Sequence, residues 1–222
     1  MQPGTVIYLN GSSSAGKSTL GRALQEVLGA RYLLLGIDSL FGAVTGRLIR
    51  TFRVGSPEIA EWSGIAWVFD EAEHVQGIEF GEEGRRLPYG LHSMVAALAS
   101  EGNNVIVDDV IMEPDMALHC AVALAETPAH LIGVRCALEV LEERERARGD
   151  RHKGLARYLY QRPHLHIPFY DFEVDSGAAS PDACASAIRD YLEAGSPPRA
   201  LAALRSSLTA SARTSELGAV AD

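Results

Sequence analysis

The sequence predicts an α/β fold, a three-layer sandwich in which helices cover both faces of a five-stranded parallel sheet. Short runs rich in Val, Ile and Leu alternate along the chain with longer segments whose apolar residues recur at helical spacing. The short runs are apolar on both faces, which is typical of central parallel strands, and the alternation indicates right-handed crossovers. The expected strands are 6–9, 32–35, 105–107, 130–134 and 171–174, and the expected helices are 17–28, 87–100, 114–126, 137–148, 154–162 and 181–194.

The first expected strand leads into residues 11–18, which read Gly-Ser-Ser-Ser-Ala-Gly-Lys-Ser and fit the phosphate-loop pattern G-x-x-x-x-G-K-S. The strand before it and the helix after it disfavour a chance match in a glycine-containing turn. Backbone N–H groups of such a loop and the helix N-terminus bind phosphate, while Lys17 reaches the β- and γ-phosphates and Ser18 ligates Mg²⁺. The predicted cofactors are therefore ATP and Mg²⁺ on a P-loop NTPase architecture. The predicted nucleotide contacts are Gly11, Ser12, Ser13, Ser14, Ala15, Gly16, Lys17, Ser18, Thr19, Arg135 and Arg151.

Acidic residues follow two further strands at the carboxyl edge of the sheet, where ligands bind in such folds. Asp108 and Asp109 both end the third strand, and we expect only one to face the metal ion, because adjacent strand residues point oppositely. The sequence does not decide between them. Asp38 ends the strand that we expect beside the phosphate-loop strand, so its carboxylate is a candidate general base for an acceptor hydroxyl. Asp38 also suits the N-cap of a short helix over 39–44.

Arg144, Arg148 and Arg151 recur every three or four residues, which places them on one helix face, and Gly149 offers a hinge where that helix should end. We expect residues 144–153 to form a lid in which Arg144 and Arg148 stabilise charge on the transferred phosphoryl group. The competing interpretation is a solvated face of glutamate–arginine pairs, because Glu139, Glu142, Glu143 and Glu145 lie among the arginines.

Residues 1–195 are expected to form the kinase domain. Within it, the aromatic-rich stretch 47–86 interrupts the alternation and is expected to lie over the site as an acceptor pocket, with an ordinary packing excursion as the alternative. Residues 196–222 are rich in Ala, Ser and Arg, and we expect this tail to bury little surface. We assign the tail no function.

The composition excludes several classes of partner. A net charge of −9 argues against a nucleic-acid partner, and no apolar run approaches the length of a membrane span. Cys120, Cys136 and Cys184 are odd in number and widely spaced, which favours free thiols and a cytoplasmic location. The pair His164 and His166 lacks further ligands at zinc spacing, so we expect ordinary packing roles for both.

The ordered motifs together resemble the chloramphenicol phosphotransferase family of P-loop kinases. The resemblance covers about 5–193 and rests on 9–18, 36–40, 77–80, 106–110, 133–136, 144, 147–151 and 170–175, while 47–76 matches least. It implies a nucleotide- or shikimate-kinase-like architecture and ATP-dependent phosphorylation of an antibiotic's primary hydroxyl, which inactivates the antibiotic. It also implies that Asp38 is the base and that the lid arginines close on phosphate.

Two other functions stay open from the sequence. The acceptor pocket could serve a nucleoside or another small metabolite instead of an antibiotic. A nucleotide-switch module without a small-molecule acceptor is disfavoured, because neither Lys17 nor Lys153 lies in an N-K-x-D guanine-binding motif. The expected partner is a small molecule with a hydroxyl group, and the oligomeric state, a homo-oligomer included, is left open.

Overall fold

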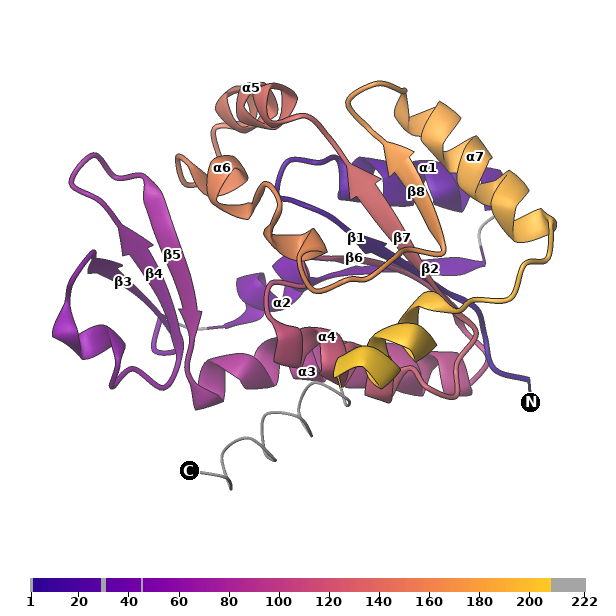
Figure 1. Ribbon diagram of the computed structural model, residues 1–222, viewed down its shortest axis with the longest axis horizontal. Coiled ribbons are helices and arrows are strands. Elements are labelled where there is room, and N and C mark those ends of the chain that lie inside the picture. The colour runs from indigo at the N-terminus through magenta and orange to yellow at the C-terminus, as the bar shows by residue number, and fades with distance from the viewer. Residues whose placement is uncertain (1, 29–30, 45, 209–222) are drawn as a thin grey trace.

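A five-stranded parallel sheet forms the centre of the protein in the computed structural model, which describes residues 2–28, 31–44 and 46–208 (Figure 1). The predicted five-stranded parallel sheet is thereby confirmed. Its strands are β1 (Val6–Asn10), β2 (Tyr32–Gly36), β6 (Asn104–Asp109), β7 (Ala129–Arg135) and β8 (Phe172–Asp175), in the spatial order β2-β6-β1-β7-β8.

The strand β2 does not lie beside the phosphate-loop strand, and that prediction is wrong. Both edges of β1 are already paired, because Val6 is in register with Val105 of β6 on one side and with Ala129 of β7 on the other. The strand β2 therefore pairs with β6 at the edge of the sheet, with Gly36 opposite Asp108.

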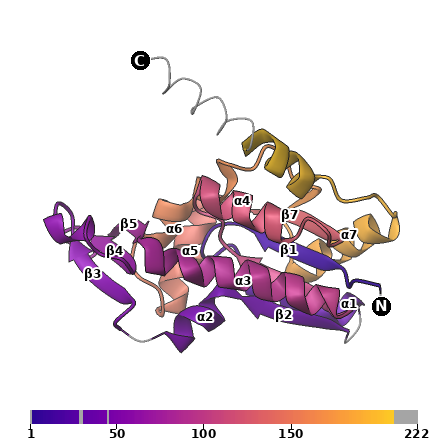
Figure 2. The ribbon, with the colours of Figure 1, turned by 90° about the horizontal axis from the view of Figure 1, so that it is seen from below.

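Helices cover both faces of the sheet, as the two views show (Figures 1 and 2). Alternate residues of β1 enter two different cores: Ile7 and Leu9 pack on one face, and Val6 and Tyr8 on the other. The helices α1 (Lys17–Leu28), α5 (Leu138–Arg148) and α7 (Pro181–Glu193) contribute to the first core. The helices α3 (Glu82–Ser100) and α4 (Pro114–Ala123) contribute to the second, which completes the three-layer sandwich.

A smaller three-stranded sheet lies at one end of the molecule, beyond the start of α3 (Figure 1). It consists of β3 (Ile49–Arg53), β4 (Ile65–Phe69) and β5 (Val75–Phe80), with β3 parallel and β5 antiparallel to β4. It accounts for most of the stretch 47–86, and α3 begins at Glu82, ahead of the expected start at 87. The remaining short elements are α2 (Ile37–Ala43), α6 (Leu155–Leu159) and the 3₁₀ turns η1 (Pro57–Ile59) and η2 (Arg162–His164).

The first part of the C-terminal tail is packed, contrary to the sequence expectation. Residues 200–208 are helical, and Ala200, Leu201 and Leu204 are buried in the same core as α3 and α4. Their spacing at i, i+1 and i+4 places these side chains on one face of the helix. At the start of this helix, the Asp171 carboxylate accepts the backbone N–H groups of Arg199 and Ala200 at 2.6 and 2.9 Å. The rest of the tail, 209–222, lies outside the described residues.

Within residues 2–28, 31–44 and 46–208, no helix has both the length and the apolar character needed to cross a membrane.

Candidate active site

The phosphate-loop segment follows β1 at the carboxyl edge of the sheet and turns directly into α1. Its backbone enters the left-handed region at Ser14 (φ 62°) and at Gly16 (φ 80°). A Cβ atom on Gly11 would lie 2.5 Å from the carbonyl oxygen of Val134, so close approach to β7 requires glycine there. The loop thus requires glycine at both motif positions, at residue 11 for close packing and at residue 16 for its positive φ.

Lys17 is buried beneath this loop. Its Nζ donates to the carbonyl oxygens of Gly11 and Ser12 at 3.0 and 2.9 Å and lies 3.6 Å from an oxygen of Asp108. Nearby, the hydroxyl of Ser14 is buried without a hydrogen-bond partner among the described residues. A buried ammonium, an unpaired hydroxyl and the N-terminus of α1 together form a site suited to a phosphate group.

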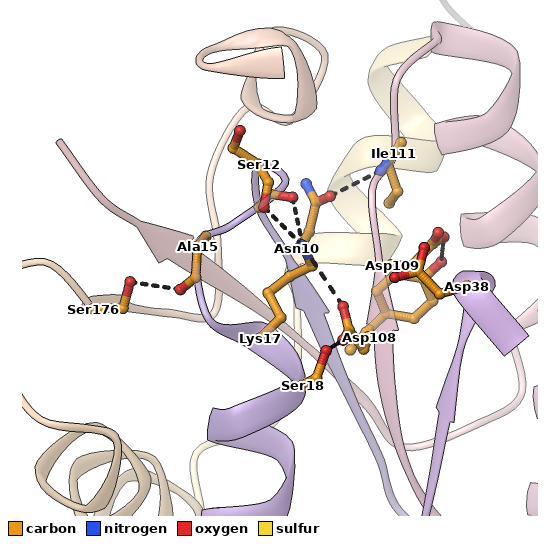
Figure 3. Close-up of polar contacts among 12 residues, drawn as sticks. Asn10, Ser12, Ala15, Lys17, Ser18, Asp38, Asp108, Asp109, Ile111 and Ser176 are labelled. Carbon is orange, nitrogen blue, oxygen red and sulfur yellow. Dashed lines mark hydrogen bonds and ion pairs between the residues drawn. The ribbon is translucent and has the colours of Figure 1, made fainter. Parts of the chain in front are cut away.

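Asp108 and Asp109 point to opposite faces of β6. The hydroxyl of Ser18 donates to Asp108 Oδ2 at 2.5 Å, and Figure 3 shows Lys17 and Ser18 both meeting Asp108. Asp109 is only 2% exposed, accepts the hydroxyl of Tyr8, and lies 3.5 Å from His92 Nε2. Asp108 is therefore the candidate metal ligand. Asp109, predicted as the alternative, points away from Ser18 and is no longer a candidate.

The surroundings of Asp109 also set its charge. Burial raises the pKa of this carboxyl group, but the neighbouring His92 ring and the Tyr8 hydroxyl outweigh burial and hold the pKa below its usual value. Burial and the Asp109 carboxylate in turn raise the pKa of Tyr8 well above its usual range. The pair is therefore an ionised aspartate and a neutral tyrosine inside the protein.

One cavity of about 680 Å³ extends from the phosphate loop to the smaller sheet. Polar groups line the end nearest α1, among them Lys17, Ser18 and Asp108. Apolar side chains line the other end, and several come from the stretch 47–86: Ile49, Trp67, Ile78 and Phe80. Residues of the stretch 47–86 therefore line this cavity, and the role of the stretch as an acceptor pocket stays a prediction.

Asp38 also lies in the wall of this cavity. It is in the first turn of α2, whose N-cap is Gly36, so Asp38 does not have the capping role that was the alternative to a catalytic one. The helix begins at Ile37, earlier than expected, and its N-cap makes no side-chain hydrogen bond. The carboxylate of Asp38 instead forms an ion pair with the guanidinium of Arg151.

The lid arginines have three different partners, none of which is a glutamate of α5. Arg144 donates to the carbonyl oxygen of Ser176 at 2.7 Å, Arg148 pairs with Asp150, and Arg151 pairs with Asp38. These partners do not match the alternative of a solvated glutamate–arginine face.

The helix α5 ends at Arg148, as expected, and Gly149 caps it in the left-handed conformation (φ 68°). Arg151 lies beyond this end and does not share a helix face with Arg144 and Arg148, so that part of the prediction is wrong.

A second cavity of about 390 Å³ lies on the other side of the phosphate loop. Arg144 lines this cavity, whereas Arg148 lines both cavities, as does Thr19. Of the other predicted nucleotide contacts, Ser13, Ser14, Gly16, Lys17 and Ser18 line at least one cavity, and Gly11, Ser12 and Ala15 line neither.

The three phosphate-loop residues that line neither cavity accept hydrogen bonds through their carbonyl oxygens. Those of Gly11 and Ser12 accept from Lys17, and that of Ala15 accepts the Ser176 hydroxyl at 2.7 Å.

Arg135 was predicted to contact the nucleotide, but the structure directs it elsewhere. It pairs with Glu173 of the adjacent strand β8 at 2.5 Å, and its guanidinium lies 5.4 Å from the centre of the Tyr170 ring. It lines neither cavity, because the end of β7 turns this side chain toward β8.

Two buried polar residues near the loop were missed by sequence reasoning. Asn10 donates to the carbonyl oxygen of Pro163 at 2.6 Å and to the Tyr170 hydroxyl at 2.9 Å, and accepts the N–H of Ile111 at 3.0 Å. A polar residue directly before the phosphate loop was the available signal for Asn10. The second residue, Glu145, lies among other charged residues of α5, and its spacing gave no signal.

His164 packs against Tyr170, which is the kind of role expected for it. His164 Nδ1 lies 2.6 Å from the Tyr170 hydroxyl, and burial, with the nearby charges of Arg135 and Lys17, lowers the pKa of His164 to about 4. In the described part of the chain, no three His, Cys, Asp or Glu side chains gather as a metal site. Cys120, Cys136 and Cys184 are free thiols.

Comparison with known proteins agrees with this geometry. Residues 4–193 match the family described as chloramphenicol phosphotransferase-like protein. A candidate O-phosphotransferase of Mycobacterium tuberculosis, found in two strains, is 31% identical over 210 residues, which cover 92% of this chain and 89% of that protein.

Among solved structures, the adenylylsulfate (APS) kinase of M. tuberculosis, in complex with AMPPNP and APS, is similar with a TM-score of 0.59 and 18% identity over 87% of this chain and 99% of that one. The shikimate kinase of Acinetobacter baumannii, in complex with shikimate, is similar with a TM-score of 0.52 and 16% identity over 88% and 95% of the two chains. These likenesses show the P-loop kinase fold. The chain belongs to the chloramphenicol phosphotransferase-like family of kinase-type phosphotransferases.

Proposed function

We propose that this protein transfers the γ-phosphoryl group of ATP to a hydroxyl group of a small, largely apolar molecule, with Mg²⁺ as the metal ion. The observation that carries the proposal is a single cavity that joins the phosphate loop to an apolar pocket, with Asp38 in its wall. Phosphoryl transfer needs a donor phosphate and an acceptor hydroxyl side by side, and this cavity can hold both.

The chain's own residues supply the donor side of the reaction. The triphosphate would lie on the backbone N–H groups of the loop and on Lys17, whose ammonium is held in place by two carbonyl oxygens. The second cavity, beside Arg144, would receive the nucleoside part of ATP. Arg148 borders both cavities and could therefore contact the phosphates of an ATP molecule that extends from one cavity into the other.

The residues at the metal position fit Mg²⁺, which prefers hard oxygen ligands. Ser18, at the start of α1, and Asp108, at the end of β6, would hold the ion. Their side-chain oxygens lie 2.5 Å apart in a hydrogen bond. A bound Mg²⁺ neutralises charge on the phosphate oxygens during transfer.

Asp38 is the proposed general base on the acceptor side. Its carboxylate, 58% exposed, can accept the proton of a hydroxyl group that enters from the apolar end. Its ion-pair partner, Arg151, lines the same cavity as Lys17, so a guanidinium lies beside the proposed base in the cavity that the phosphate loop borders. In this position Arg151 can stabilise charge on the group being transferred.

The apolar end of the cavity favours an acceptor with an aromatic or aliphatic body. Trp67, Phe80 and Ile49 offer flat and branched surfaces, and few polar groups are available there to bind a highly hydroxylated molecule. Chloramphenicol and related hydroxylated antibiotics are therefore the first acceptors to test, and inactivation of the antibiotic would be the outcome for the cell.

The test is acceptor-dependent release of ADP, with the mass of the phosphorylated product, over a panel of antibiotics, nucleosides and simple alcohols. We expect turnover with an apolar alcohol and a loss on the order of 10²–10⁴-fold in Asp38→Asn, with ATP binding retained. The matched control is Asp190→Asn, since Asp190 is similarly exposed (65%), also pairs with an arginine, and lies outside both cavities. Full activity in Asp38→Asn would remove Asp38 as the base, and no turnover with any acceptor would contradict the proposal.

A further inference from the structure

Residues 149–154 form a strap that joins α5 to α6 and carries Arg151. Both of its ends are glycines in the left-handed conformation, Gly149 at φ 68° and Gly154 at φ 79°, which other residues adopt at a cost. A chain with such ends is free to swing unless other contacts fix it. The place of Arg151 in the cavity therefore depends on what holds the strap.

The side chain of Glu145 is the contact that closes the strap on the α5 side. This residue is 8% exposed, and its two carboxylate oxygens accept the backbone N–H groups of Gly154 at 2.8 Å and of Ala156 at 2.5 Å. The N-cap residue of α6 makes no side-chain hydrogen bond, so Glu145, from the neighbouring helix α5, accepts the N–H groups at the start of α6 in its place. A carboxylate near the C-terminal end of a helix is repelled by the helix dipole, and burial of its charge costs free energy. The two hydrogen bonds from Gly154 and Ala156 offset these costs and allow Glu145 to be buried there.

The strap and the start of α6 together contact both parts of the proposed active site. Ala156 accepts the hydroxyl of Ser12 at 3.5 Å, which links the start of α6 to the phosphate loop. On the acceptor side, the carbonyl oxygen of Lys153 accepts the N–H of Val75 at 2.8 Å. The ring of His152 lies 4.8 Å from the ring centre of Trp67, in the wall of the larger cavity.

We infer that Glu145 is a positioning residue for phosphoryl transfer: its carboxylate fixes the strap so that Arg151 stays in the larger cavity, paired with Asp38. The inference rests on the proposed function. Glu145 itself lines neither cavity, so its effect must pass through the strap. The N–H groups that it binds flank Leu155, only a few residues beyond Arg151, so loss of these two bonds removes the side-chain contacts that hold the Gly154 hinge.

The first test needs no enzymatic activity. In Glu145→Gln, the side-chain amide can accept one N–H group but turns a donor toward the other, so we expect amide hydrogen exchange at 149–156 to quicken by on the order of tenfold. The matched control is Glu143→Gln, an exposed glutamate of the same helix, for which we expect no change in exchange. Unchanged exchange at 149–156 in Glu145→Gln would overturn the inference.

The second test asks whether Glu145 acts through Arg151. We expect Glu145→Gln to lower kcat on the order of tenfold in the wild-type background, and to have little further effect once Arg151→Ala is present. A general loss of structure would instead lower kcat by the same factor in both backgrounds, and that result would overturn the inference. Absence of turnover in the wild type would overturn the proposed function, whereas the exchange measurement would still decide whether Glu145 fixes the strap.

Discussion

Two neighbouring aspartates at the end of β6 should respond in opposite ways to the same substitution. Asp108→Asn changes a side chain that is 17% exposed and faces Ser18 and Lys17. Asp109→Asn changes a carboxylate that is 3% exposed and faces Tyr8 and His92. The first substitution should affect catalysis and the second should affect folding.

The expected cost of Asp109→Asn follows from what its carboxylate contacts. A hydrogen bond to a charged group contributes about 1.5–3 kcal/mol, and an uncharged amide leaves the Tyr8 hydroxyl buried without a charged acceptor. We therefore expect the free energy of unfolding to fall by about 2–3 kcal/mol. For a chain of this size that is a decrease of about 5–10 °C in Tm.

Asp108→Asn should leave the free energy of unfolding within about 1 kcal/mol of the wild type, because an amide oxygen can still accept from Ser18. Acceptor-dependent turnover should instead fall on the order of 10²–10³-fold, since a group that helps to stabilise transition-state charge is lost. The Mg²⁺ concentration that supports half-maximal turnover should rise.

The two assays are thermal unfolding followed by circular dichroism and ADP release measured over a range of Mg²⁺ concentrations. The contrast between the two variants is the decisive result, and each serves as the control for the other. The reasoning fails if Asp109→Asn retains its Tm but loses the response to Mg²⁺, or if Asp108→Asn unfolds at the lower temperature of the pair.

Three further predictions concern stability. The pKa of His164 is lowered from 6.5 to about 4, so the unfolded state binds a proton more readily than the folded state does. The free energy of unfolding should therefore fall as the pH drops from 6.5 to 4. Linkage gives a loss of at most about 3 kcal/mol, and we expect about half of that because water reaches part of the ring. Denaturant titrations at several pH values should show this loss in the wild type and a smaller one in His164→Gln, and an equal loss in both would contradict it. Leu204→Ala should cost about 2–4 kcal/mol because Leu204 is fully buried, whereas the 68% exposed Leu165 should tolerate alanine within about 0.5 kcal/mol, as urea unfolding can check. Gly133→Ala should cost about 1–3 kcal/mol because its Cβ would lie 2.7 Å from an aromatic ring, whereas Gly90→Ala, with open space in α3, should stabilise by up to about 1 kcal/mol; comparable Tm values for the two would refute this.

Local patterns were enough to predict the main sheet and the phosphate loop. The strands of the five-stranded sheet are short apolar runs, and Gly16 and Lys17 act through a left-handed backbone and through hydrogen bonds to carbonyl oxygens five or six residues away. Such features depend on neighbours in the sequence, so they can be recognised without knowledge of the fold.

Long-range contacts decided the points on which prediction failed. The pairing of β6 between β1 and β2 depends on which strands meet across the sheet, and no local pattern in 32–35 records it. The alternative of a capping role for Asp38 fails because α2 begins earlier, and Arg135 points away from both cavities because β8 supplies Glu173 beside it. The burial of 200–208 needed a surface formed by distant helices.

The sequence by itself determined that this chain folds as an α/β protein with a phosphate-binding loop, because strand and helix periodicity and the loop's glycines are local properties. Only the tertiary structure decided that Asp108 meets Ser18 and that Asp109 does not. It alone also placed Asp38 beside Arg151 and buried Glu145 against the strap. The physical reason is that these contacts join residues far apart in the chain, so their partners are set by strand order and packing rather than by the neighbouring residues.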